Sequence, residues 1–167
     1  MTILALDLGT YTGVCRGDAG ASPVCETWRL PAGGGRDVGP FMDAFEKMLA
    51  DALPGVTVLI FEAPFVGAKM LNNMNVARRL VGLPALCEML AHRHSIECAE
   101  ANIMTLKKEF AGSGRAEKSD MIHAAGKRGF RVENEHEADA SAVWLHAVAL
   151  RWPEHASKYD PIFARRV

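Results

Sequence analysis

The sequence predicts an α/β domain with a mixed five-stranded sheet flanked by helices. Three strand-like segments joined by short turns occupy the first 30 residues. The continuous apolar run "VTVLIFE" at 56–62 is typical of a strand that is covered on both faces. Helical and strand patterns then alternate through the remainder of the chain, as in α/β domains. A length of 167 residues suffices for a substantial core, so we expect residues 1–167 to form one domain.

Strand formers and turn residues define the amino-terminal elements. Residues 2–7, 12–16 and 24–30 are rich in strand formers or alternate in polarity, and glycine-containing turns separate them. Because these turns are short, we expect an antiparallel meander. The glycine-rich segment 31–37 is expected to be a loop. Apolar residues at helical spacing then predict a helix over about 38–52.

The second half of the chain alternates between helical and strand patterns. The run 56–62 is the predicted central strand, and a long helical pattern covers roughly 72–94. Pro84 lies within this pattern and is expected to break or kink the helix, because proline lacks the backbone N–H. Further elements are predicted as a strand at 95–100, a helix near 103–111 capped by Asn102, a helix from 116 to 127 and a last helix from about 136 to 151.

Composition is that of an ordinary soluble protein, with 49% hydrophobic and 23% charged residues. No apolar run is long enough to span a membrane, and the amino terminus has no signal-peptide pattern, so we expect a cytoplasmic protein. The four cysteines form no C-x-x-C pair, which favours free thiols in a reducing compartment. They are Cys15, Cys25, Cys87 and Cys98.

Positive charge is concentrated in one part of a nearly neutral chain. The net charge is −1, yet residues 102–131 contain seven lysines and arginines against three carboxylates. Such a stretch could hold phosphates, or it could be a solvated helix surface.

Acidic residues interrupt the most apolar segments of the sequence. Asp7 lies within "LALDLGTYTGV", and Glu62 ends the central strand. His136 and Asp139 are three residues apart and share one face of the last helix. A buried unpaired charge costs several kcal/mol, roughly, so these acids require compensation. Two divalent cations about 4 Å apart would supply it and could clamp a phosphodiester.

Simpler roles for the same acids remain open at this point. Asp7 could cap a turn through backbone amides, and Glu62 could pair with a basic side chain. Asp139 could stabilise the amino terminus of the last helix.

Four stretches resemble the RuvC-type Holliday junction resolvases of the ribonuclease H-like superfamily. In order they are "ALDLGTYTGV", "LIFEAPFVGAKM", "LKKEFAGSGRAEKSDMIHAA" and "HEADASAVWLHAVA", and the likeness spans about residues 3–150. The resemblance implies a ribonuclease H-like fold. It also implies that Asp7, Glu62 and Asp139 are catalytic acids holding two Mg²⁺ or Mn²⁺ ions. His136 stands where many relatives have aspartate, and it could bind metal or accept a proton.

The resemblance also implies a set of DNA contacts. Lys107 and Lys118 match basic residues near the scissile phosphate, and Lys118 would stabilise the leaving oxygen. Phe65 would stack on an unpaired base. Solvated helix ends for the lysines and core packing for Phe65 are the alternatives. The remaining candidates for DNA contacts are Arg78, Arg79 and Arg115. Glu135 and Glu137 flank His136 and are expected to be exposed or to interact with the helix dipole.

The resemblance implies a metal-dependent endonuclease that resolves four-way junctions by paired symmetric nicks. Relatives act as homodimers, and the helix near 74–92 is apolar enough to bury one face against another subunit. Met70 and Met74 are expected to pack internally or to lie at this interface. A broader endonuclease on branched DNA and a noncatalytic junction-binding protein are alternatives. A third is an ATP-binding actin-like domain, since "LDLGTYTG" resembles a phosphate loop. The sequence does not indicate whether a branch-migration motor assists.

Overall fold

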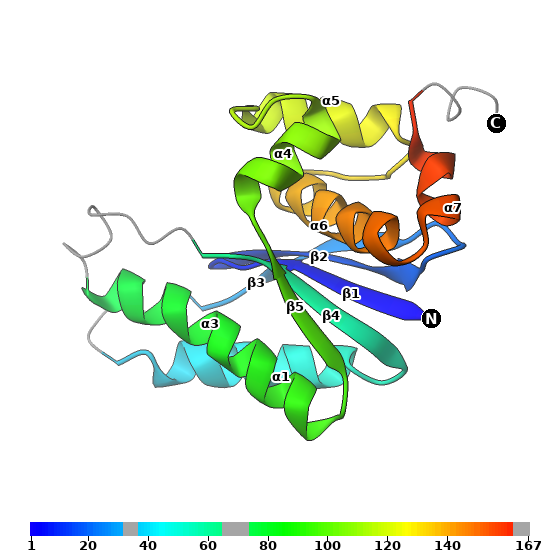
Figure 1. The fold of residues 1–167 in the computed structure, drawn as a ribbon. Coiled ribbons are helices and arrows are strands. Elements are labelled where there is room, and N and C mark those ends of the chain that lie inside the picture. The colour runs from blue at the N-terminus through cyan, green and yellow to red at the C-terminus, as the bar shows by residue number, and fades with distance from the viewer. Residues whose placement is uncertain (32–36, 65–73, 162–167) are drawn as a thin grey trace.

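The computed structural model describes residues 1–31, 37–64 and 74–161 and contains a five-stranded mixed sheet (Figure 1). The strand order is β3-β2-β1-β4-β5. Strands β1 (Thr2–Asp7), β2 (Tyr11–Asp18) and β3 (Val24–Arg29) pair antiparallel and form the predicted meander. On the other side of β1, strands β4 (Val56–Glu62) and β5 (Glu97–Ala101) add in parallel. The predicted fold class is therefore confirmed.

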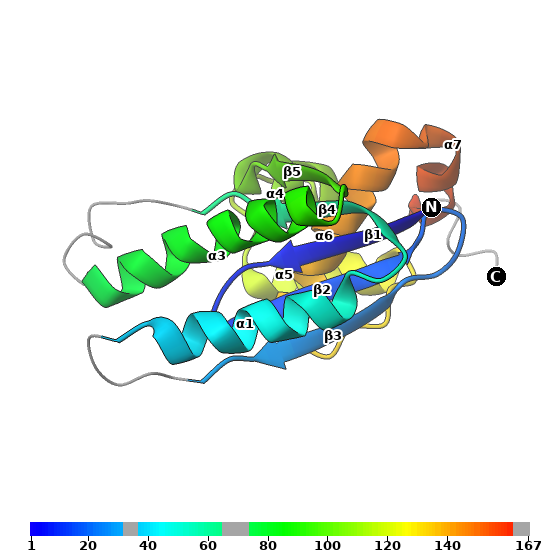
Figure 2. The same ribbon diagram turned by 90° about the horizontal axis from the view of Figure 1, so that it is seen from below.

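Helices cover both faces of the sheet (Figures 1 and 2). Helices α1 (Gly39–Ala52) and α3 (Met74–Arg93) lie on one face. The other face carries α4 (Ile103–Ala111), α5 (Lys118–Lys127), α6 (Glu135–Arg151), α7 (Pro153–Ala156) and the 3-10 turn η1 (Ser157–Tyr159). Each face has its own hydrophobic cluster. Within the described part of the chain, none of the helices has the length and apolar character needed to cross a bilayer.

Side-chain alternation along the strands decides which residues face α6. In β1, Ile3 and Ala5 belong to the cluster beneath α6, whereas Leu4 and Leu6 belong to the cluster under α1 and α3. Successive side chains of a strand point to opposite faces, so Asp7 lies on the α6 side. In β4, Val58 and Ile60 share the α6 cluster. By the same alternation, Glu62 also faces α6.

Local sequence signals set both ends of α4. Asn102 caps α4, because its side-chain oxygen accepts from the backbone N–H groups of Met104 at 2.9 Å and Thr105 at 3.3 Å. This predicted cap is confirmed. Gly112 then ends α4 in the left-handed conformation, with φ of 84°.

The predicted break at Pro84 is wrong, because α3 runs without interruption from Met74 to Arg93. Proline removes one helical hydrogen bond, a cost of about 3 kcal/mol or more. Buried residues lie on both sides of Pro84, namely Leu83, Cys87 and Leu90. Their packing against α1 and the sheet stabilises the helix across the proline, as tertiary packing generally does for helices.

Gly13 lets the amino terminus of α6 lie directly on β2. A Cβ atom at this position would be 1.9 Å from the carbonyl oxygen of His136 and 2.4 Å from its carbonyl carbon. Backbone atoms cannot yield as a flexible side chain can. The missing side chain at Gly13 therefore sets the height of His136 above the sheet.

Replacing Gly13 with alanine is expected to destabilise the protein by more than about 3 kcal/mol, since the new methyl group would push α6 off the sheet. Urea unfolding monitored by circular dichroism measures the change. The matched control is Gly126→Ala within α5, where a Cβ meets no atom within 4 Å. That variant should gain about 0.5–1 kcal/mol from helix propensity. Equal stability of the two variants would contradict the close approach.

Candidate active site

Three carboxylates converge where β1 and β4 end. Leu6 and Phe61 are partners in the parallel register, so the next residues, Asp7 and Glu62, end adjacent strands side by side. Both face α6, and the second turn of that helix supplies Asp139. The candidate catalytic acids thus come from two strands and one helix, as the sequence predicts.

Burial and neighbouring negative charge raise the pKa of Glu62 and of Asp139. Burial raises the pKa of Glu62 to about 8, and the negative charges of Asp7 and Asp139 add to the effect. Burial and the charge of Asp7 likewise raise the pKa of Asp139 to about 6. Positive charge on Lys107 works in the opposite direction for both groups. Glu62 forms no ion pair with any described residue, so the pairing alternative has no support in the structure.

His136 contacts Asp7 and the ring of Tyr11. Its Nδ1 atom lies 3.2 Å from Asp7 Oδ2, and this hydrogen bond raises the imidazole pKa. Tyr11 stacks on the imidazole with ring centroids 5.8 Å apart and planes inclined by 15°. Two contacts therefore fix the orientation of a ring whose side chain is 30% exposed. No sequence motif singles out Tyr11, although its place at the start of β2 follows from the turn after Asp7.

The donor set is suited to hard divalent cations. Asp139 Oδ1 is buried without a hydrogen-bond partner among the described residues, so it is available as a ligand. Burial, together with neighbouring negative charge, raises the pKa of Glu62 and Asp139, and a bound cation would offset both effects. As they stand, however, no three acidic, histidine or cysteine side chains of the described residues are arranged to hold an ion. Metal coordination is therefore a proposal that rests on donor chemistry.

Lys107 and Lys118 flank the acids. Lys107 is half-buried and donates to the Ala116 carbonyl oxygen at 3.0 Å, while its charge lowers the pKa of Glu62 and Asp139. Lys118 is exposed and donates to Glu135 Oε1 at 2.8 Å. The hydrogen bond to Glu135 raises the pKa of Lys118, and the charges of Asp139 and Asp7 add to this effect. The structure thus brings both predicted lysines to the edge of the acidic centre.

Glu137 differs from its expected role, whereas Glu135 is the partner of Lys118. Glu137 is only 5% exposed and links α6 to β3. Its Oε1 atom accepts from Thr27 Oγ1 at 2.9 Å and from Asn134 Nδ2 at 3.0 Å. Its Oε2 atom accepts from the Glu133 backbone N–H at 2.7 Å. This buried network anchors the helix turn that carries His136, and no local sequence pattern indicates the contact with Thr27.

Other predicted DNA contacts are spread over the surface. Arg115 is exposed beside α5, and Arg78 is exposed on α3. The guanidinium of Arg79 lies 5.0 Å from the ring centre of buried Phe41, so this arginine packs against the core. Phe65 and Met70 lie outside the described residues. The DNA roles of the three arginines and Phe65 remain predictions, as does the packing or interface role of Met70.

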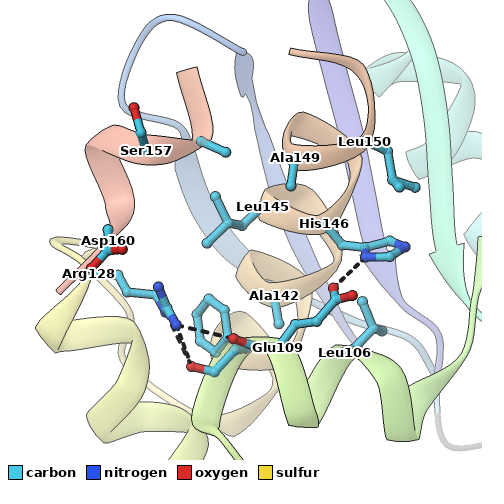
Figure 3. A pocket seen from close by; sticks show the side chains of 12 residues that line it. Leu106, Glu109, Arg128, Ala142, Leu145, His146, Ala149, Leu150, Ser157 and Asp160 are labelled. Atoms are coloured by element: carbon cyan, nitrogen blue, oxygen red, sulfur yellow. Dashed lines mark hydrogen bonds and ion pairs between the residues drawn. The ribbon is translucent and has the colours of Figure 1, made fainter. Parts of the chain in front are cut away.

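Part of the basic stretch serves packing. A cavity of about 370 Å³ lies between α4, α6 and the carboxyl-terminal turns (Figure 3). Arg128 at its edge donates to the carbonyl oxygens of Phe110 at 2.9 Å and Tyr159 at 3.0 Å. On the opposite wall, His146 Nδ1 lies 2.7 Å from Glu109 Oε2. Since His146 follows His136 by ten residues, the cavity is about 15 Å along α6 from the acidic centre.

All four cysteines carry free thiols in the structure, and Cys25 and Cys98 are only partly buried. Cys15 and Cys87 are buried, and burial raises the pKa of both thiols.

Comparison with solved structures defines the class of the fold. No protein-family model matches the sequence, and no curated protein matches it. The structure, in contrast, has the fold of Holliday junction resolvases. RuvC from Thermus thermophilus superposes with a TM-score of 0.63 at 18% identity, over 92% of this chain and 97% of that one. T. thermophilus RuvC in complex with a Holliday junction substrate superposes with a TM-score of 0.70 at 16% identity, over 90% of this chain and 95% of that one.

A second resolvase shares the fold. The yeast mitochondrial Holliday junction resolvase Ydc2 superposes with a TM-score of 0.61 at 15% identity, over 99% of this chain and 84% of that one. The chain therefore has the RuvC fold, and the predicted resemblance is confirmed at the level of the fold.

Removal of the Glu62 charge should stabilise the protein at alkaline pH in EDTA. A carboxyl group whose pKa rises from 4.5 to about 8 on folding contributes stability that is complete below pH 4.5 and lost as pH rises to 8. Glu62→Gln has no such loss. Its melting temperature should exceed that of the wild type by about 3–6 °C at pH 8.5, and the difference should vanish toward pH 4.5.

Glu100→Gln, at an exposed position on β5, is the charge-matched control and should follow the wild type. Adding Mn²⁺ at pH 8 should raise the melting temperature of the wild type more than that of Glu62→Gln. If the melting temperatures of the wild type and Glu62→Gln change with pH in parallel, the raised pKa of Glu62 is contradicted.

Proposed function

We propose that this protein is a divalent-metal-dependent endonuclease that resolves four-way DNA junctions. The observation that carries the proposal is the convergence of Asp7, Glu62 and Asp139 on one face of a RuvC fold. The neighbouring lysines add the positive charge that a phosphodiester requires. One solved relative with this fold is described in complex with a Holliday junction substrate.

Asp7, Glu62 and Asp139 would hold two Mg²⁺ or Mn²⁺ ions, with His136 as a further ligand or as a proton acceptor. When bound, such ions clamp the scissile phosphate, lower the pKa of water and stabilise the leaving oxygen. The nitrogen donor of His136 favours Mn²⁺ over Mg²⁺, because Mg²⁺ prefers oxygen ligands.

The side chains around the acids have separate tasks in hydrolysis. With Asp7 ionised, His136 donates its Nδ1 hydrogen to Asp7 Oδ2, which leaves Nε2 able to take a proton from water. Lys107 is positioned by the Ala116 carbonyl oxygen and offsets phosphate charge. Lys118 can exchange Glu135 for the leaving 3′-oxygen and stabilise its charge. The products are a 3′-hydroxyl and a 5′-phosphate, formed without a covalent enzyme intermediate.

We also propose that the protein acts as a homodimer, because two symmetric nicks require two sites. An apolar groove of about 650 Å³ between α1 and α3 supports this proposal. Met74 and Val81 at the groove are 63% and 53% exposed, an unusual exposure for large apolar side chains. A second copy could cover them.

A mobile synthetic four-way junction with Mn²⁺ or Mg²⁺ tests the function. Paired nicks at symmetric positions on two opposing strands are expected. Three-way junctions, flaps and linear duplex serve as competing substrates. Comparable cleavage of all of them would favour the broader nuclease. Binding without cleavage would favour the noncatalytic alternative, and calorimetric binding of ATP would favour the actin-like one.

Replacing Asp7 with asparagine should abolish cleavage, by at least about 10³-fold, and leave junction binding within about twofold of the wild type. The change removes a charged oxygen but preserves shape. Gel-based cleavage and fluorescence anisotropy measure the two effects. Asp51→Asn, an exposed aspartate on α1, is the control. Cleavage by Asp7→Asn at the wild-type rate would overturn the assigned role.

His136→Asp should retain cleavage and increase the ratio of Mg²⁺-supported to Mn²⁺-supported rates by about tenfold, since an oxygen ligand replaces nitrogen. Metal titrations of the cleavage rate measure this ratio. His92→Asp, at the exposed end of α3, controls for the added negative charge. Complete inactivity of His136→Asp with either metal would instead indicate that the imidazole is needed as a proton acceptor.

A further inference from the structure

Tyr11 and Arg29 lie together at the β3 edge of the sheet, beside the acidic centre formed by Asp7, Glu62 and Asp139. They are partners in the antiparallel register of β2 and β3. The guanidinium carbon of Arg29 lies 5.7 Å from the centre of the Tyr11 ring, and that ring stacks on His136 at 5.8 Å. An arginine is thus connected to the candidate catalytic histidine through a single aromatic ring.

Strand alternation places both residues on the α6 face. In β3, Thr27 bonds Glu137 of α6, and Arg29 follows two residues later on the same face. The end of β3 is fixed to the start of β2, because the Leu30 backbone N–H donates to the Thr10 carbonyl oxygen at 2.9 Å. Backbone hydrogen bonds between β2 and β3 therefore hold the positions of Tyr11 and Arg29.

Arg29 is exposed and makes no ion pair with any described residue. Tyr11 is 45% exposed. A guanidinium held against an aromatic face is pre-organised and retains its N–H groups for a bidentate anion contact. Lys107 and Lys118 come from α4 and α5, whereas this cation comes from the β3 edge of the sheet.

We propose that Arg29, supported by the Tyr11 ring, binds a backbone phosphate of the DNA strand that passes through the acidic centre. This inference rests on the proposed nuclease function and extends the substrate path to the β2–β3 edge. The lysines contact the strand near the scissile phosphate from one flank. Arg29 contacts a phosphate one to three nucleotides away on the other flank and so fixes the register of the strand.

Junction binding in EDTA, followed by fluorescence anisotropy at several salt concentrations, tests Arg29 without cleavage. Arg29→Gln should weaken binding about five- to twentyfold. It should also reduce the magnitude of the slope of log K against log salt by about 0.9, the value expected for the loss of one phosphate contact. Arg29→Lys should recover part of the loss. Arg16→Gln is the matched control, because Arg16 bonds the Pro54 carbonyl oxygen before β4 begins, at the opposite end of the sheet.

Tyr11 variants separate support by the ring from a direct contact. Tyr11→Phe keeps the ring and should bind as the wild type does. Tyr11→Leu should approach the loss seen for Arg29→Gln. Melting temperatures verify that the variants are folded. If Tyr11→Leu is not folded, the binding result for Arg29→Gln alone decides the test.

Methylphosphonate substitution locates the phosphate. After the nicks are mapped, a neutral linkage placed one to three nucleotides away should weaken binding by the wild type but not further weaken binding by Arg29→Gln. Wild-type affinity for Arg29→Gln, or equal coupling at every linkage, would overturn the inference. Failure of the wild type to cut any DNA would overturn the proposed function instead.

Discussion

The repulsion among carboxylates at the ends of β1 and β4 is the constraint around which this structure is arranged. Parallel pairing places Asp7 beside Glu62, and strand alternation turns both toward α6. Neither position is freely hydrated, and the pKa of Glu62 rises to about 8 as a result. A fold optimised for stability alone would place apolar side chains at these strand ends. The presence of acids there supports the proposed function.

The surrounding residues offset this charge in three ways. His136 bonds Asp7, Lys107 lowers the pKa of both neighbouring acids, and protons neutralise Glu62 and Asp139 as pH falls. Each of these compensations is exchangeable. A cation can replace the protons, and a phosphate can pair with the positively charged lysines. A site held together by exchangeable partners is suited to bind metal and phosphodiester together.

The position of α6 depends on two contacts at its amino terminus. Gly13 allows the backbone of His136 to approach β2 closely, and the buried Glu137 network fastens the same turn to β3. The first is a close approach of backbone atoms, and the second runs through the buried Glu137 side chain, which accepts from Thr27 Oγ1 and from the Glu133 backbone N–H. The sheet therefore fixes the positions of His136 and Asp139.

The sequence by itself determined the strands and helices, the mixed sheet and the placement of acids at strand ends and on the last helix. Those features depend on local signals, such as the Asn102 cap, and on the cost of burying Asp7 and Glu62 in apolar runs. Only the tertiary structure decided that α3 continues through Pro84, that Glu137 is buried against Thr27, and that Tyr11 links His136 to Arg29. These features join residues far apart in the chain or depend on packing on both sides of a helix. No local pattern encodes them, because the free energy that stabilises each arises from a neighbour that only the folded chain supplies.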